Sequence, residues 1–271
     1  MKLPLRKADS HKGQNGKVLV IGGNEVFHGA PLLTARGAEK SGVDLVFVAV
    51  PPAQALPLKM ANTNFIVHEF SGAHLRAQDI PLLLSIADQV DLVAIGNGLG
   101  KEPETQAALL SCLAQMRKSL VLDGESLFPE IFTVQSRNSW ILTPHEGEFM
   151  RLFKLPGTAE NVWKVAKKYR VTILKKGEID FIADEEQCFE NTTGVPQMTV
   201  GGTGDALAGI TAGFWAQGLS AIAACHSAAY FWGRCGEKLA ATRFSFSAWE
   251  MLEELPRILK EESIKMEKLP L

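Results

Sequence analysis

A glycine-rich run followed by an aspartate has the residue types and spacing needed for phosphoryl transfer. Residues 201–205 read Gly-Gly-Thr-Gly-Asp and lead into an apolar stretch, residues 206–210, typical of a helix. Glycines let the backbone approach an anion and point N–H groups at it, and the positive end of the following helix favours phosphate. Asp205 would repel that phosphate unless it takes a proton from the group that meets it. The run therefore indicates phosphoryl transfer onto a hydroxyl, with a simple N-cap role for Asp205 as the alternative.

The composition indicates a globular protein without a charge bias. The 271 residues are 46% hydrophobic and carry 28 basic and 30 acidic side chains, which gives a formal net charge of −2. This length suffices for one large domain or two small ones, and the charge balance gives no sign of a nucleic-acid or membrane partner. Four cysteines without metal-ligand spacing indicate reduced thiols. The N-terminus lacks an apolar segment, so we expect no signal peptide and a cytoplasmic protein.

Short apolar segments alternate with amphipathic ones along the chain, and this alternation predicts the elements that must position Asp205. Strands are predicted at 17–21, 45–50 (stopped by Pro51-Pro52), 65–68, 92–95, 120–122, 140–142 and 171–174, and helices at 31–41, 80–89, 104–116, 159–169, 206–217, 221–238 and 248–259. Such strands covered by helices predict an α/β fold with a mostly parallel sheet. Residues 179–183 and 187–190 predict an antiparallel hairpin. We expect residues 1–271 to form a single domain.

Polar and glycine-rich segments follow several of these predicted strands, at residues 22–31, 96–100, 123–127 and 143–148. Ligands of open α/β sheets bind at the carboxyl ends of the strands, so we expect these segments to converge on one site. The segment at 96–100, Gly-Asn-Gly-Leu-Gly, lacks the full spacing of a dinucleotide fingerprint, which disfavours a Rossmann dehydrogenase.

Taken together, these segments resemble those of the ribokinase-like superfamily and, within it, of the ADP/ATP-dependent NAD(P)H-hydrate dehydratases. The matching pieces occur in the family's order at 11–13, 18–23, 29–31, 41–46, 96–100, 142–149, 176–180 and 198–209. Thr-Pro-His-x-Gly-Glu at 143–148 combined with Gly-Gly-Thr-Gly-Asp is the most specific part, since generic sugar and vitamin-precursor kinases tend to have Asn in place of His145. The resemblance implies a three-layer α/β/α fold with a mostly parallel central sheet.

The resemblance also implies a reaction. The substrate would be NADH or NADPH hydrated at C6 of the nicotinamide ring, NAD(P)HX, whose hydroxyl is phosphorylated by ADP or ATP before phosphate is eliminated. The result is a net dehydration that repairs the nucleotide. A kinase of a small sugar or vitamin-precursor alcohol is the alternative, and a non-catalytic nucleotide-binding protein is a further one. The sequence leaves open whether ADP or ATP is the donor and whether NADHX or NADPHX is the preferred substrate.

Roles for individual residues follow from the same resemblance. Asp205 would be the catalytic base and contact the substrate, together with Ala30, Gly98 and His145. The nucleotide and its phosphates would contact Lys176, Gly177, Glu178, Ile179, Asp180, Gly202, Thr203 and Gly204. Glu148 would organise Mg²⁺ through water, a role suited to a carboxylate.

Each of these assignments has a plainer structural alternative. Ala30 and Gly98 could merely permit tight turns, and His145 could be a turn residue bonded to the backbone. Glu148 could be a first-turn charge favoured by the helix dipole. Lys175 adjoins Lys176, so the sequence leaves open which lysine faces the nucleotide.

The chain also departs from the family pattern. Asn97 stands where proline is usual, and we expect this change to loosen the loop because proline fixes φ. Gly124-Glu125 replaces a small-acidic-small pattern, which alters charge near the site and leaves Asp123 without an assigned role. The epimerase domain that often precedes this domain in the family is not in this sequence, so we expect dehydration alone. We expect a homo-oligomer, a dimer or tetramer, which exposed apolar helix residues such as 214–215 and 230–232 would allow.

Overall fold

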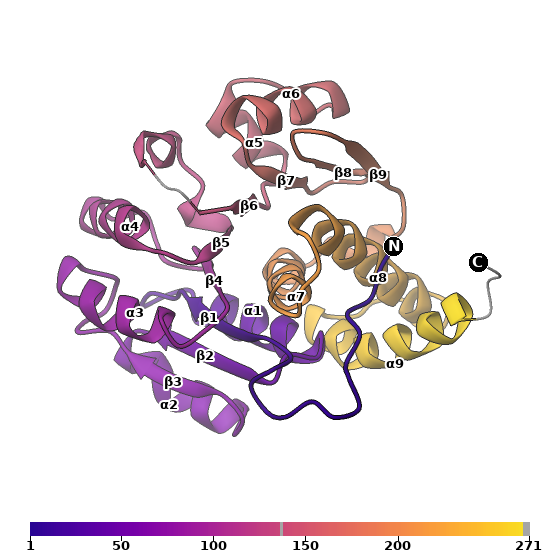
Figure 1. Cartoon of the computed structure of the whole chain (residues 1–271), viewed down its shortest axis with the longest axis horizontal. Coiled ribbons are helices and arrows are strands. Elements are labelled where there is room, and N and C mark those ends of the chain that lie inside the picture. The colour runs from indigo at the N-terminus through magenta and orange to yellow at the C-terminus, as the bar shows by residue number, and fades with distance from the viewer. Residues whose placement is uncertain (136–137, 268–271) are drawn as a thin grey trace.

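The computed structural model describes residues 1–135 and 138–267, and its centre is a nine-stranded sheet with the order β3-β2-β1-β4-β5-β6-β7-β8-β9 (Figure 1). The strands are β1 (Lys17–Ile21), β2 (Leu45–Val50), β3 (Ile66–Glu69), β4 (Leu92–Ile95), β5 (Ser119–Leu122), β6 (Trp140–Leu142), β7 (Thr172–Lys175), β8 (Asp180–Ala183) and β9 (Cys188–Asn191). Strands β1 to β7 pair in parallel, whereas β8 and β9 form an antiparallel hairpin on β7. The expected parallel sheet and hairpin are both confirmed.

Helices lie on both faces of this sheet and give three layers. One face belongs to α1 (Gly29–Lys40), α2 (Pro52–Ala61), α7 (Thr203–Ala216), α8 (Ala221–Ala240) and α9 (Ala248–Glu267). The other belongs to α3 (Ile80–Ala87), α4 (Pro103–Gln115), α5 (Glu146–Phe153) and α6 (Ala159–Tyr169). Helices α1 and α7 approach closely, since a Cβ on Gly209 of α7 would overlap the carbonyl oxygen of Thr34 in α1. The α/β/α fold class is confirmed.

Covering both faces of the sheet explains why its strands are continuously apolar. In β1, Val18 and Val20 pack into the core that includes α7, whereas Leu19 and Ile21 pack into the core that includes α3 and α4. All four side chains are fully buried. A parallel strand covered on both sides selects apolar residues at every position rather than at alternate ones.

Several element bounds differ from the expectation. Helix α2 begins at Pro52, which we had taken only as the end of a strand; proline is well placed in a first helical turn, where its missing N–H has no partner to lose. Helix α5 was not expected and begins after its N-cap, His145. Helix α7 begins at Thr203 rather than at residue 206, and its N-cap is Gly202. The N-cap role for Asp205 is therefore wrong, because Asp205 lies inside the first turn.

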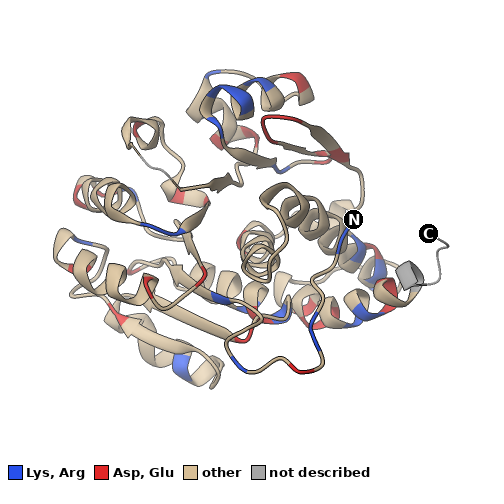
Figure 2. Cartoon of the chain, viewed as in Figure 1, with Lys and Arg blue, Asp and Glu red and all other residues tan. Residues whose placement is uncertain are grey.

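The aromatic residues of α7 and α8 do not form an exposed surface. Phe214, Phe231 and Trp232 are buried, and Trp215 and Tyr230 pack against the same core. The expectation that Phe214, Phe231 and Trp232 are exposed is therefore wrong, because they pack into the core. The homo-oligomer itself stays a prediction. Acidic and basic residues are interspersed on the outer helices, whereas α7 carries almost no charge (Figure 2). Among residues 1–135 and 138–267, no helix is long and apolar enough to cross a membrane.

Candidate active site

The point where the chain reverses direction across the sheet lies between β1 and β4. The chain runs from β1 outward to β2 and β3 and then returns to the other side of β1 as β4. At such a switch point the loops that follow the strands diverge and leave room for a ligand. The loops after β1 and β4 are tied together there, because Gly23 N–H donates to the carbonyl oxygen of Asn97 at 2.9 Å. The N-terminal turn of α7 lies beside this junction.

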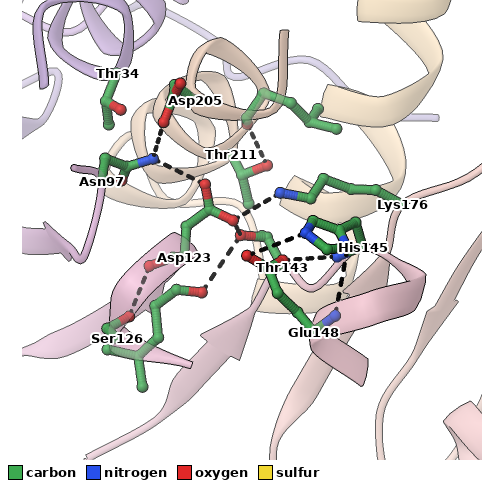
Figure 3. Close-up of polar contacts among 12 residues, drawn as sticks. Thr34, Asn97, Asp123, Ser126, Thr143, His145, Glu148, Lys176, Asp205 and Thr211 are labelled. Atoms are coloured by element: carbon green, nitrogen blue, oxygen red, sulfur yellow. Dashed lines mark hydrogen bonds and ion pairs between the residues drawn. The ribbon is translucent and has the colours of Figure 1, made fainter. Parts of the chain in front are cut away.

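A chain of polar contacts joins Asp205 to the ends of the neighbouring strands (Figure 3). Asn97 Nδ2, from the loop after β4, donates to Asp205 Oδ1 at 2.7 Å and to Asp123 Oδ2 at 2.8 Å. Asp123, which follows β5, accepts on its Oδ1 from Thr143 Oγ1 at 2.7 Å. The same Oδ1 pairs with Lys176 Nζ, after β7, at 2.7 Å. The predicted segments thus converge, and they meet at Asp123.

The electrostatics of this chain of contacts suit a base at neutral pH. Burial raises the pKa of Asp205 to about 6, and the nearby charge of Asp123 adds to this effect, while Asn97 and Lys176 oppose it. Burial alone would lower the pKa of Lys176, but Asp123 and Glu148 outweigh it, so the pKa of this lysine is raised. Lys176 therefore stays protonated and supplies positive charge to a cluster of carboxylates.

A cavity of 800 Å³ opens beside the N-terminal turn of α7 and the turn between β7 and β8. It is lined by Lys176, Gly177, Glu178, Ile179, Asp180, Thr192, Thr193, Gly194, Val195, Pro196, Met198, Thr199, Thr203, Gly204, Leu207, Ala229, Trp232 and Gly233. The residues expected to contact a nucleotide lie here together, except Gly202, which is the N-cap of α7 with a φ of +90°. The other lining residues were missed, because none of them is charged: Thr192, Thr193, Gly194, Val195, Pro196, Met198, Thr199, Leu207, Ala229, Trp232 and Gly233.

The start of α7 supplies donors for an anion. The first helical hydrogen bond there runs from Ala206 N–H to the Gly202 carbonyl at 3.0 Å. The N–H groups that begin a helix have no acceptor within it, and here they lie beside a lysine. A Cβ on Gly204 would stand 3.1 Å from Lys176 Nζ, so this glycine lets the ammonium group approach the helix end. Lys175, the neighbouring candidate, points elsewhere and pairs with Glu146 at 2.8 Å.

Two of the residues expected to contact the hydrated dinucleotide, Ala30 and Gly98, lie next to each other. A Cβ on Gly98 would stand 3.2 Å from Cβ of Ala30, so these two residues adjoin. Gly98 N–H donates to Glu125 Oε2 at 3.1 Å, and its φ of +73° favours glycine. Glu125, an unassigned departure from the family pattern, thus orders the loop that holds Gly98. None of these residues lines the 800 Å³ cavity.

His145 and Glu148 form a capping box at the start of α5. His145 Nδ1 accepts from the N–H groups of Gly147 at 3.0 Å and Glu148 at 3.3 Å, and Glu148 Oε2 accepts from His145 N–H at 2.9 Å. Burial and, after it, the charge of Lys176 lower the pKa of His145, which suits a neutral acceptor. Burial raises the pKa of Glu148 to about 7. The structure therefore gives both residues a structural role beside the site.

The contribution of the protein to a metal site is sparse. The described parts of the chain contain no group of three or more His, Cys, Asp or Glu side chains that could hold a metal ion. Mg²⁺ commonly takes one or two carboxylates and completes its shell with phosphate oxygens and water. Glu148 is 7% exposed and interacts with Lys176 and Asp123. The single buried carboxylate of Glu148 fits a Mg²⁺ ion whose other ligands would be nucleotide phosphate oxygens and water.

Sequence reasoning misjudged Asn97 and left Asp123 without a role. The expectation that Asn97 loosens its loop is wrong, because the residue is 1% exposed and its side chain bonds two carboxylates. In the structure Asp123 contacts Asn97, Thr143 and Lys176. The sequence showed only that an acidic residue follows a predicted strand. The available signal was positional: Asn97, Asp123 and Thr143 each follow a predicted strand within two residues.

Comparison with known proteins decides the family. A family-wide sequence model described as NAD(P)H-hydrate dehydratase matches residues 18–257. The chain belongs to this family. A dehydratase relative, the ADP-dependent (S)-NAD(P)H-hydrate dehydratase of Cenarchaeum symbiosum, is 38% identical over 95% of this chain and 93% of its own length. The bifunctional NAD(P)H-hydrate repair enzyme of Methanothermobacter thermautotrophicus is 36% identical, and the match covers 96% of this chain but 52% of that enzyme.

Solved structures of NAD(P)H-hydrate dehydratases and their relatives share the fold. The ADP/ATP-dependent NAD(P)H-hydrate dehydratase of Bacillus subtilis, co-crystallised with ATP/Mg²⁺, has a TM-score of 0.84 at 28% identity and covers 96% of this chain and 94% of that one. A ribokinase-like superfamily protein of Enterococcus faecalis has a TM-score of 0.84 at 31% identity, covering 96% and 92%. The dehydratase family and the ribokinase-like fold expected from the sequence are therefore confirmed.

Proposed function

We propose that this chain dehydrates NAD(P)HX to NADH or NADPH with ADP or ATP as the phosphoryl donor. The observation that carries the proposal is the Asp205 carboxylate, held by Asn97 in the first turn of α7, where Thr203 and Gly204 line the 800 Å³ cavity. The names of its relatives support the reaction, since one is an ADP-dependent dehydratase and another was crystallised with ATP/Mg²⁺. We also propose that the chain forms one domain, as its described strands all join one sheet.

Asp205 acts in the first step as the base. Its carboxylate accepts the proton of the substrate hydroxyl while the hydroxyl oxygen bonds to the terminal phosphorus of the nucleotide. The bond from that phosphorus to the bridging oxygen breaks, and the nucleotide keeps the electron pair. A carboxyl with a pKa of about 6 is ionised at neutral pH and still basic enough to accept a proton. Lys176 and the N–H groups that begin α7 stabilise the charge on the moving phosphoryl group.

The second step needs less from the protein. Phosphate leaves C6 with the electron pair of the C–O bond, assisted by electron donation from the ring nitrogen, and a proton is lost from the neighbouring carbon. This restores the ring double bond and gives NAD(P)H, phosphate and the shortened nucleotide. Phosphorylation is required because hydroxide is a poor leaving group and phosphate a good one. The base and the anion site of a kinase thus suffice for a net dehydration.

The two ligands are assigned to two sets of residues near Asp205. The nucleotide donor occupies the cavity beside Lys176, Gly177, Glu178, Ile179 and Asp180, with its phosphates at Gly202, Thr203 and Gly204. The hydrated dinucleotide lies against Ala30, Gly98 and His145. Mg²⁺, when bound with the nucleotide, would be held through water by Glu148 and would neutralise phosphate charge.

The test is an assay of NADH recovery from its hydrate in the presence of ATP or ADP. We expect the absorbance of reduced nicotinamide to rise only with a nucleotide, and Asp205→Asn to lower kcat by about 10²–10⁴-fold with the fold retained. The matched control is Asp88→Asn, because Asp88 is exposed just before β4 and so lies at the opposite end of the strands. A stable phosphorylated product without NADH would favour the small-alcohol kinase. Equal activity of Asp205→Asn and wild type would remove the base from the mechanism.

A further inference from the structure

Asn97 lies between two carboxylates, that of the base Asp205 and that of Asp123. Its amide nitrogen contacts Asp205 Oδ1 at 2.7 Å and Asp123 Oδ2 at 2.8 Å, so each of its two N–H bonds has a carboxylate acceptor (Figure 3). The backbone of Asn97 is fixed by the bond from Gly23, and the residue is 1% exposed. Among the residues that the structure describes, Asn97 Oδ1 is buried without a hydrogen-bond partner.

The chemistry of an amide explains this placement. An amide NH₂ is a neutral group with two donors, so it can join two anions without neutralising either by proton transfer. The reverse orientation would direct the amide oxygen at both carboxylates, which excludes it. The orphaned oxygen is unfavourable in a buried place, and this indicates that the two donated hydrogen bonds decide the orientation. A purely structural asparagine would be expected to satisfy both of its ends.

We propose that Asn97 is the positioning residue of the catalytic base: its amide fixes Asp205 through Oδ1, leaves Oδ2 for the substrate hydroxyl, and keeps the carboxyl ionised against the charge of Asp123. The inference rests on the proposed function for the identity of the reaction. The contacts support the assignment, because Asn97 makes the one hydrogen bond that Asp205 side-chain oxygens receive within residues 1–135 and 138–267.

The charged groups around Asp205 show in which direction its pKa would change if the Asn97 amide were removed. Asp123, after β5, and Glu125, in the turn that follows, both raise the pKa of Asp205, in addition to the larger effect of burial. Lys176, after β7, and the Asn97 amide lower it. Lys176 is already paired with Asp123, so Asn97 is the group that bonds Asp205 directly. Without the amide, the base would hold its proton to a higher pH.

The experiment compares wild type with Asn97→Leu, which removes both donors and keeps a similar volume. We expect the acid limb of the kcat profile, measured from about pH 5 to about pH 9, to move upward by about one to two pH units, with KM changed by less than about twofold. The matched control is Ser126→Ala. Ser126 is fully buried and donates to the carbonyl oxygens of Ile95 and Asp123, so it reports the loss of a nearby structural hydrogen bond without contact to Asp205. Its acid limb should stay in place.

A second readout does not depend on turnover. Carbon-13 NMR titration of aspartate-labelled protein, with the Asp205 signal assigned from Asp205→Asn, should give a higher pKa for Asp205 in Asn97→Leu than in wild type. If Asn97→Leu does not fold, the smaller Asn97→Ala takes its place in both measurements. Folded variants in which Asp205 titrates as in wild type, or in which only KM changes, would overturn the inference. If wild type recovers no NADH from its hydrate, the proposed function fails, whereas the NMR shift still decides the role of Asn97.

Discussion

Replacing Lys176 with methionine should destabilise the protein through the charge that it leaves behind. Lys176 Nζ lies 2.7 Å from Asp123 Oδ1, and the two side chains are 16% and 4% exposed. Methionine has nearly the length of lysine, so little packing is lost. Breaking a buried ion pair costs about 3–5 kcal/mol because the remaining charge has no counter-charge. Lys176 is partly exposed, and Asp123 keeps its hydrogen bonds from Asn97 and Thr143. We therefore expect the free energy of unfolding to fall by an amount near the lower end of this range, about 3 kcal/mol.

The measurement is urea denaturation followed by circular dichroism at neutral pH. For a chain of this size about 3 kcal/mol corresponds to a Tm lower by roughly 6–12 °C, and the denaturant slope should not change. Lys175→Met is the matched control. Lys175 pairs with Glu146, whose side chain is 53% exposed, so the carboxylate left behind is solvated and the loss should be about 1 kcal/mol.

The double variant Lys176→Met/Asp123→Asn separates charge from packing. Asparagine removes the uncompensated anion, so the double variant should recover most of the stability that Lys176→Met loses. The reasoning would be refuted by a Lys176→Met protein within about 0.5 kcal/mol of wild type, which is the range of an ordinary surface substitution. It would equally be refuted by a double variant no more stable than the single one, since the loss would then not come from Asp123.

Three further predictions concern the capping residues and the glycine-rich run. Burial raises the pKa of Glu148 from 4.5 to about 7, so its stabilising contribution is complete below pH 4.5 and is lost as the pH rises through 7. Between about pH 5 and pH 8 the free energy of unfolding of wild type, measured relative to Glu148→Gln, should fall by about 2.5 kcal/mol; parallel pH dependences of the two proteins would contradict this. His145→Ala removes the acceptor for two N–H groups and should lower the free energy of unfolding, measured with denaturant, by about 1 kcal/mol. Unchanged stability would contradict this, because water would then replace the ring as acceptor at no cost. Gly202→Ala should lower the free energy of unfolding by about 2 kcal/mol, because φ is +90° there, which strains alanine, and a Cβ would overlap Leu33. Adding Leu33→Ala should recover part of this loss; no recovery would show that the overlap does not contribute.

The sheet and the location of the site could be predicted from sequence for a physical reason. Strands buried on both faces are apolar at each position, and this pattern identifies β1, β2 and β4 without knowledge of their neighbours. Parallel strands all end at the same edge, so the polar residues after them must meet. Asn97, Asp123 and Lys176 follow β4, β5 and β7 and do meet there. Which of them contact one another cannot be predicted from the residues next to them in the sequence.

The remaining errors arise where distant residues decide the structure. Asn97 bonds to Asp205, 108 residues later in the chain, and no local pattern distinguishes this from a loop asparagine. Helix periodicity likewise does not reveal whether a second layer covers a helix, so Phe214 and Trp232 were expected at the surface and are buried. Helix α5 was missed because its start depends on the paired side chains of His145 and Glu148, and the sequence analysis considered a turn role and a helix-dipole role for each residue separately.

The division of the site between one helix and several loops has a consequence for its chemistry. Asp205 and the N–H donors at residues 202–205 share one helical turn, so helix geometry fixes their relative positions. That helix is held on all sides, since the residues from Ala206 to Phe214 are buried. The charged and hydrogen-bonding groups that shift the pKa of Asp205 in addition to burial, by contrast, come from the loops after β4, β5 and β7. Substitutions in those loops should therefore change the pH at which the base works more than its distance from the phosphate. This separation accounts for a site in which Asn97 and Glu125 can depart from the family pattern while the base and the anion site stay in place.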